Sequence, residues 1–178
     1  MGTHVARLSL CPSVKSLARD FDKSEYSNMK EQAEFYRVGL LLGLFKISDV
    51  IAWCDSVIMA EAAPDLAIIE ASMSGGKGVD AVVSALSEMK GEFDSRSVKK
   101  RIFRSMHDLV NQDREQALRI ARLLYGMAFD DFAWNEEIEQ EMRSFDNAFD
   151  DVAYRNYTEE KITDEMLQFL KKQSTSLD

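Results

Sequence analysis

Apolar residues recur every three or four positions through most of the chain. The clearest row lies in segment 134–152, where the intervals between its large apolar residues are four, four, three, four and three. These residues are Trp134, Ile138, Met142, Phe145, Phe149 and Val152. Such spacing places all six side chains on one face of an α-helix. No segment combines two-residue alternation, β-branched residues and turn signals, so the sequence predicts no β-strand.

The same spacing elsewhere predicts about eight helices joined by short connections. They are expected over residues 26–44, 48–58, 64–73, 79–91, 98–110, 114–129, 134–152 and 163–172. Ser48 is expected to cap the second helix, because a serine hydroxyl can accept a hydrogen bond from the first turn. Segment 114–129 is apolar on most sides, which is typical of a central helix. Gly39 and Gly43, four residues apart, predict a face on which a neighbouring helix packs closely.

These elements predict an all-α protein whose single domain is an irregular helical bundle or array. A chain of 178 residues is of single-domain size and can bury roughly 70% of its unfolded surface. We expect an N-terminal arm or short helix over residues 1–24, a helical domain over 25–172 and a C-terminal tail over 173–178. No motif repeats at a fixed period, so a true helical-repeat array is not predicted.

The composition is that of a folded protein, and we expect a cytoplasmic one. Hydrophobic residues make up 46% of the sequence, with only two prolines and eight glycines, which is far from the composition of disordered chains. Cys11 and Cys54 are too few for a disulfide framework, so reduced thiols are expected. No apolar run approaches the length of about 20 residues that spans a bilayer, so no membrane partner is expected.

Negative charge is concentrated in the last third of the sequence. The whole chain has a net charge of −9. Between Tyr125 and Glu165 there are thirteen acidic residues and only three basic ones, Arg143, Arg155 and Lys161. Phosphate backbones require a basic surface, so nucleic-acid binding is not expected. The acidic surface instead favours a basic protein as the partner.

Candidate catalytic and metal-binding residues are sparse, and each has a structural interpretation. Segment 74–78 is rich in glycine but lacks the residue order of a phosphate-binding loop, so a simple connector is expected. His107 has Asp108 beside it but no nucleophile and no Glu-x-x-His arrangement. Cys54 lies among apolar residues rather than beside positive charge. The sequence therefore predicts a non-enzymatic protein with no catalytic residues, no cofactor and no metal site.

Acidic and aromatic residues are interleaved within segment 134–152 and shortly after it. Charge steers the encounter between two proteins, and buried aromatic side chains anchor the complex. We therefore predict a surface that binds a basic protein. Its residues are Glu136, Glu137, Glu139, Asp146, Asp150, Asp151, Tyr154 and Tyr157. The alternative interpretation is that these carboxylates only solvate the outer face of a helix while the aromatic residues face the core.

The stretch 43–58, GLFKISDVIAWCDSVI, resembles an opening found in small helical bacterial proteins. Some of those proteins are uncharacterised, and some are assigned as immunity proteins of toxin delivery systems. Cys54 departs from the pattern, which more often has alanine there. The resemblance implies a cytoplasmic protein that binds one cognate toxin domain, such as a basic nuclease, and covers its active site or a neighbouring surface. It transfers no binding residues, because the matching stretch is structural.

Three hypotheses for function follow. The leading one is an immunity or inhibitor protein that neutralises a basic toxin domain through the acidic and aromatic surface. The second is a structural or regulatory helical module that forms homo-oligomers through its apolar faces or through Gly39 and Gly43. The third is an enzyme whose site is assembled from dispersed carboxylates and arginines. The basic run 96–104 is expected to be solvated or paired with acids of the same chain.

Overall fold

The structure, a computed structural model, describes residues 29–129, 134–152 and 158–176. These residues form eight α-helices and two short 3₁₀ helices, and they include no strand. The α-helices are α2 (Met29–Leu41), α3 (Ile47–Ala60), α4 (Leu66–Met73), α5 (Val79–Ser87), α6 (Ser95–Gln112), α7 (Ala117–Met127), α8 (Glu136–Asp150) and α9 (Glu159–Ser176). The predicted all-α fold is therefore confirmed. The predicted N-terminal arm lies outside the described residues, and α9 continues into the segment predicted to be a tail.

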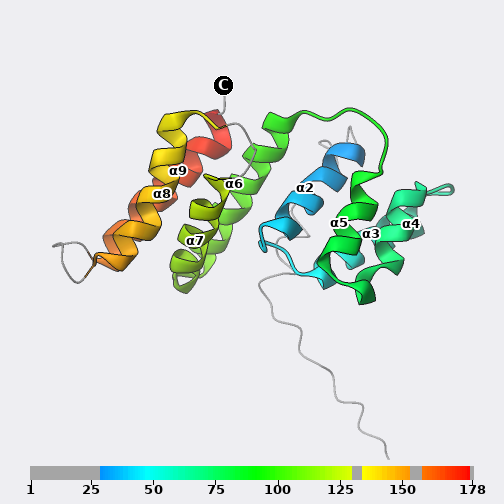
Figure 1. Cartoon of the computed structure of the whole chain (residues 1–178), viewed down its shortest axis with the longest axis horizontal. Helices are drawn as coiled ribbons and strands as arrows, with labels where there is room; N and C mark the ends of the chain where they lie inside the picture. The colour runs from blue at the N-terminus through cyan, green and yellow to red at the C-terminus, as the bar shows by residue number, and fades with distance from the viewer. Residues whose placement is uncertain (1–28, 130–133, 153–157, 177–178) are drawn as a thin grey trace, which may run out of the picture.

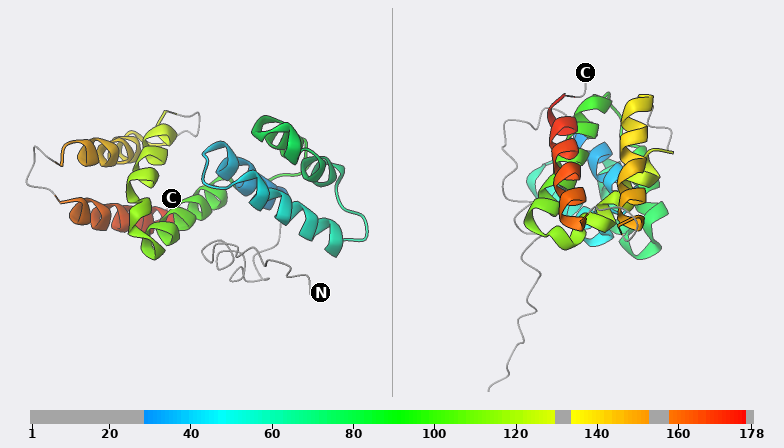
Figure 2. Two further views of the ribbon diagram at one scale, coloured as in Figure 1. Left: turned by 90° about the horizontal axis from the view of Figure 1, so that it is seen from below. Right: turned by 90° about the vertical axis from the view of Figure 1, so that its left-hand side faces the viewer.

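The helices form two groups along the long axis of the molecule (Figure 1). Helices α2–α5 make the group on the right of Figure 1, and α6–α9 make the group on the left. In each group the first helix packs against the fourth and the second packs against the third. Helix α2 also packs against α6, so it joins the two groups, which Figure 2 shows side by side from below.

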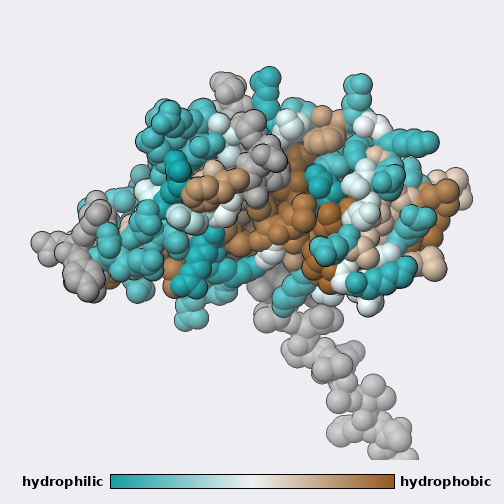
Figure 3. All heavy atoms as spheres, in the orientation of Figure 1, coloured by the Kyte–Doolittle hydropathy of each residue, from teal (hydrophilic) through white to brown (hydrophobic). Residues whose placement is uncertain are grey.

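Two hydrophobic clusters form the interior, and α2 contributes to both. Ala33 and Leu40 belong to the cluster built with α3, α4 and α5. Phe35 and Val38 belong to the cluster built with α6 to α9. Apolar atoms are visible at the junction between the two groups (Figure 3). The central helix of the fold is thus α2, because its opposite faces are buried in different clusters.

The prediction that segment 114–129 forms the central helix is wrong. Helix α7 buries one row of residues in the second cluster, including Ile120 and Leu124. Its other side leaves Leu118 exposed, and beyond its end Phe129 is 61% exposed. The chief packing partner of α7 is α8, so α7 is covered on one side only.

Two helix starts show how local side chains set the boundaries. Helix α3 begins at Ile47, after Lys46 at the N-cap position, so Ser48 is not the cap that the sequence predicted. Instead the Asp49 carboxylate accepts a hydrogen bond from the Lys46 backbone N–H at 3.0 Å. Helix α4 has an ordinary cap, in which Asp65 accepts a hydrogen bond from the Ala67 N–H at 2.8 Å.

Gly39 and Gly43 do not form a helix-packing face. The side of Gly39 that would carry a Cβ is occupied by the Phe45 ring, 2.2 Å from the position of that atom. Gly43 has φ +70° and ends α2. There the Gly43 N–H donates to Leu40 and the Leu44 N–H donates to Gly39, the pattern of a Schellman motif. The Phe45 ring therefore covers Gly39, while Gly43 stays exposed where the chain turns back onto α2.

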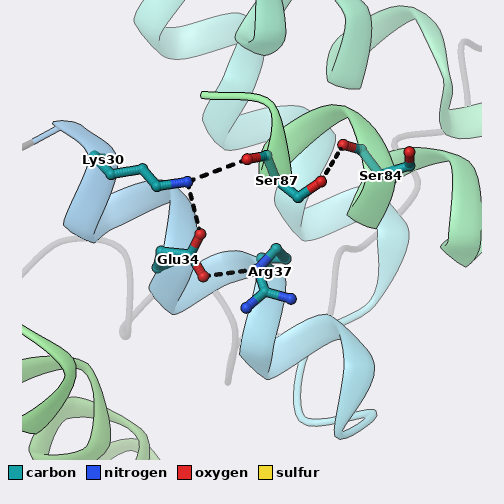
Figure 4. A network of polar contacts seen from close by, with 5 residues as sticks. All are labelled: Lys30, Glu34, Arg37, Ser84 and Ser87. Atoms are coloured by element: carbon teal, nitrogen blue, oxygen red, sulfur yellow. Dashed lines mark hydrogen bonds and ion pairs between the residues drawn. The ribbon is translucent and has the colours of Figure 1, made fainter. Parts of the chain in front are cut away.

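A buried polar network fixes α2 against α5 (Figure 4). Lys30 and Glu34, both almost fully buried, form an ion pair of 2.8 Å. Arg37 contacts the other oxygen of Glu34 at 2.7 Å. Lys30 also donates to the backbone carbonyl of Ser87, the last residue of α5, at 3.3 Å. A cation at this position is favourable, because the last carbonyls of a helix carry partial negative charge.

No α-helix within the described ranges is both long enough and apolar enough to cross a bilayer.

Candidate partner-binding surface

Five of the six predicted acidic residues lie on α8 and Asp151 follows its last residue, but the six do not share one face. Glu136, Glu139, Asp146 and Asp150 are spaced three, seven and four residues apart, which aligns them along one side of the helix. Glu136 and Asp150 are exposed, whereas Glu139 and Asp146 are partly buried. Glu137 lies away from this row, because its position does not fall on the three-and-four spacing. Asp151 is the C-cap residue, beyond the last helical position.

The acidic residues at the two ends of α8 have different effects on the stability of the helix. Asn135 caps the helix by accepting a hydrogen bond from the Ile138 N–H at 2.8 Å. Glu136, Glu137 and Glu139 lie in the first turn, where negative charge is favourable. Asp150 is the last helical residue, and negative charge there is unfavourable. Helix stability thus accounts for the first-turn acids but not for Asp150.

A row of partly apolar residues is exposed on the outer side of α7 and just beyond it. Leu118, Arg122, Tyr125 and Phe129 follow each other at intervals of four, three and four. Tyr125 is 38% exposed and Phe129 is 61% exposed. Their ring centroids are 5.1 Å apart, so the two aromatic side chains form one contact area rather than two isolated positions.

Two arginines connect the row on α7 with the acidic row on α8. The Arg122 Nε atom lies 4.0 Å from an oxygen of Asp146. The Arg143 guanidinium lies over the Phe129 ring, 5.5 Å from its centroid. The two rows are therefore adjacent and form one surface. We call it the α7–α8 surface, and its residues are Leu118, Arg122, Tyr125, Phe129, Glu136, Glu139, Arg143, Asp146 and Asp150.

The aromatic residues predicted for this surface, Tyr154 and Tyr157, lie outside the described residues. Trp134 is half-buried, its ring packs edge-on against Phe103, and its Nε1–H donates to the Met127 carbonyl at 3.0 Å. It therefore belongs to the core. The exposed row on α7 was not predicted, because a segment that is apolar on most sides is expected to be covered by other helices all round.

The other candidates for chemistry considered in the described residues are metal-binding clusters and Cys54. No group of three or more histidine, cysteine or acidic side chains there could hold a metal ion. Cys54 is fully buried. Burial raises the pKa of its thiol to about 12, and the charge of Asp55 adds to the effect. A thiol with this pKa remains protonated near neutral pH and is a poor nucleophile.

The basic run of α6 is partly turned inward. Arg101 donates to Gln32 at 2.5 Å and lies over the Phe35 ring, 4.1 Å from its centroid. Lys99 lies over the Trp134 ring, 4.4 Å from its centroid, and burial lowers its pKa. These contacts attach α6 to α2 and to the start of α8. Arg96 and Arg104 are the exposed members of the run.

Comparison of the chain with known protein families, with curated proteins and with solved structures finds no match.

Proposed function

We propose that the chain is a non-enzymatic cytoplasmic binding protein of the immunity or inhibitor type, and that its α7–α8 surface binds a basic protein such as a toxin domain. The observation that carries the proposal is the placement of exposed aromatic side chains directly beside a row of carboxylates. Tyr125 and Phe129 supply apolar area that is available for burial, and the adjacent acids favour a positively charged partner.

The charge at the end of α8 supports the same function. Asp150 is unfavourable for the helix that carries it. An exposed carboxylate that is not needed for the stability of its own helix remains available to a partner. Long-range attraction from such charges raises the rate of encounter with a basic protein and weakens as salt is added.

The contact between Arg143 and Phe129 indicates how the partner can be recognised. A guanidinium already lies 5.5 Å from the centroid of this ring, so the local environment accepts a cation over the aromatic face. An arginine of the partner can stack on the exposed Tyr125 and Phe129 rings in the same way. The carboxylates of Glu139 and Asp150 then lie on the adjacent row to pair with neighbouring cations of the partner.

The test is affinity capture by tagged protein from a lysate of the cells that produce it, with two surface variants run in parallel. Glu136→Lys/Asp150→Lys reverses two exposed charges, and Tyr125→Gln/Phe129→Gln removes the aromatic anchors. We expect a basic protein that the wild type retains at low salt and both variants lose. The activity of that purified protein should then be inhibited by the wild type alone.

The matched control is Glu88→Lys/Glu165→Lys, which reverses two exposed charges outside the α7–α8 surface, one just after α5 and one on α9. It should retain the same partner as the wild type. Capture of the same proteins by all variants would exclude the α7–α8 surface as the binding site. Retention of only the chain itself would favour the alternative function, a helical module that acts by self-association.

A further inference from the structure

The three most exposed large apolar side chains of the described residues lie on one pair of adjacent helices. Met59 near the end of α3 is 88% exposed, Met73 at the end of α4 is 75% exposed, and Leu66 at its start is 74% exposed. Single apolar residues are normal on a protein surface. Three on neighbouring helices form a patch, and Figure 3 shows apolar atoms at this end of the molecule.

The outer face of α4 is apolar along its whole length. Leu66, Ile69 and Met73 follow each other at intervals of three and four, on the side away from the buried residues Ala67 and Ala71. Helix α4 has eight residues and is about 12 Å long. The core-facing side of α4 therefore packs against α3 and α5. Its outer side is not covered by any other described part of the chain.

Helix α3 extends the same face. Met59 lies on the side of α3 away from the buried residues Cys54 and Val57. The two helices pack against each other, and the Ser72 hydroxyl donates to the Asp55 carboxylate between them at 2.5 Å. Met59 and the outer row of α4 therefore form one surface. We call it the α3–α4 surface, and its apolar residues are Met59, Leu66, Ile69 and Met73.

The charged residues of α3, of α4 and of the segment between them are all negative, and the nearest lysines in the sequence are Lys46 and Lys77. Residues 47–76 contain no lysine and no arginine. They contain five acidic residues, Asp49, Asp55, Glu61, Asp65 and Glu70. All except Asp49 are exposed. Glu61 follows the end of α3 and Glu70 lies on α4 beside the apolar row, so carboxylates border the patch.

We propose that the α3–α4 surface docks a cationic amphipathic helix of another protein. Methionine side chains are flexible and polarisable, and they adapt to the apolar face of such a helix. Lysines and arginines along the edges of the docked helix would meet the bordering carboxylates. A second copy of this chain fits less well, because two acidic borders would face each other. The surface belongs to a different helix group from the α7–α8 surface (Figure 1), and the inference does not depend on the proposed function.

The probe is a fluorescently labelled Leu/Lys peptide of about 18 residues, long enough for five helical turns, with its leucines on one face. A peptide of the same composition with its leucines spread around the helix is the control ligand. Binding is measured by fluorescence anisotropy as the full chain is titrated. We expect the wild type to bind the amphipathic peptide at least about tenfold more tightly than the control peptide, because only the former presents a continuous apolar face.

The variant Met59→Gln/Met73→Gln should weaken that binding at least about tenfold. Both side chains are exposed, so the substitutions leave the core intact, which far-UV circular dichroism and thermal unfolding would verify. Glu61→Gln/Glu70→Gln should weaken binding at low salt and reduce its dependence on salt. Glu88→Gln/Glu165→Gln removes two exposed charges elsewhere and should leave the affinity unchanged.

Three results would overturn the inference. The first is equal affinity for the two peptides. The second is a loss of binding in Tyr125→Gln/Phe129→Gln but not in Met59→Gln/Met73→Gln, which would assign the peptide to the α7–α8 surface. The third is a concentration-dependent dimer in sedimentation that disappears in Met59→Gln/Met73→Gln, since a second copy would then occupy the surface.

Discussion

The close packing of the Phe45 ring against Gly39 predicts how a side chain added at position 39 would change stability. Gly39→Ala would place a Cβ 2.2 Å from ring carbons of Phe45, so the ring must move within a packed core. We expect a loss of about 1–3 kcal/mol in the free energy of unfolding, measured by urea titration. Gly76→Ala is the matched control, because nothing lies within 4 Å of that position. An equal effect of both substitutions would contradict the packing role of Gly39.

Cys54 predicts a particular dependence of stability on pH. Burial raises the thiol pKa from 9.0 to about 12 in the folded chain, while in the unfolded chain it ionises near its ordinary value. Ionisation therefore stabilises only the unfolded chain as pH rises from about 9 towards 12, and the free energy of unfolding falls. Cys54→Ala removes this contribution. Relative to the wild type, the variant should gain about 1 kcal/mol between pH 7 and pH 10 in urea unfolding. A constant difference at both pH values would show that the thiol is not buried as described.

The two ends of α8 give opposite predictions for substitutions that remove one negative charge. Asp150→Asn should raise the free energy of unfolding by about 0.3–1 kcal/mol, because it removes negative charge from the C-terminal end of the helix. Glu136→Gln should lower it by a similar amount, because it removes favourable charge from the first turn. Thermal unfolding at low salt measures both effects. Both variants should also weaken capture of the basic partner.

Measuring both stability and partner capture distinguishes a binding role of Asp150 from mere solvation of the helix. If Asp150 only solvates the helix, Asp150→Asn stabilises the chain and leaves partner capture unchanged. If it belongs to the α7–α8 surface, the same substitution stabilises the chain and weakens binding. A loss of stability in Asp150→Asn would contradict the assignment of Asp150 to the end of α8.

Helices α7 and α8 show what the hydrophobic pattern could and could not predict. The pattern identified both helices and the buried side of α8, since Met142 and Phe145 lie in the core. It placed α7 in the centre, because segment 114–129 is apolar on most sides. Spacing fixes which residues share a face, but it does not show whether another helix covers that face. The exposed aromatic row therefore became visible only in the folded structure.

The start of α3 and the end of α2 show the same limit of prediction from the sequence. Ser48 suits an N-cap by residue type, yet α3 starts earlier because the Asp49 carboxylate bonds the Lys46 N–H. Gly39 and Gly43 have the spacing of a helix-packing face, but the Phe45 ring folds back over the first. In each case a local contact overrode what residue type or spacing alone predicts.

The arrangement of the two helix groups places the two proposed surfaces on different parts of one folded unit. The α3–α4 surface lies on the first group, and the α7–α8 surface lies on the second (Figure 1). Helix α2 is buried between the groups, and Arg119 of α7 donates to the Gly43 carbonyl at the end of α2, at 2.5 Å. Disruption of either group therefore removes contacts that the other group uses.

This shared helix predicts that the two groups unfold together. Ile68 is fully buried in the first cluster, and Ile68→Ala should cost about 3 kcal/mol. Opening that cluster frees α2, whose Phe35 and Val38 complete the second cluster. In hydrogen exchange measured by mass spectrometry, α7 and α8 should therefore lose as much protection as α3 and α4. Ile120→Ala, in the second cluster, should give the reciprocal result. Loss of protection confined to the group that carries the substitution would mean that α2 joins two independently stable units.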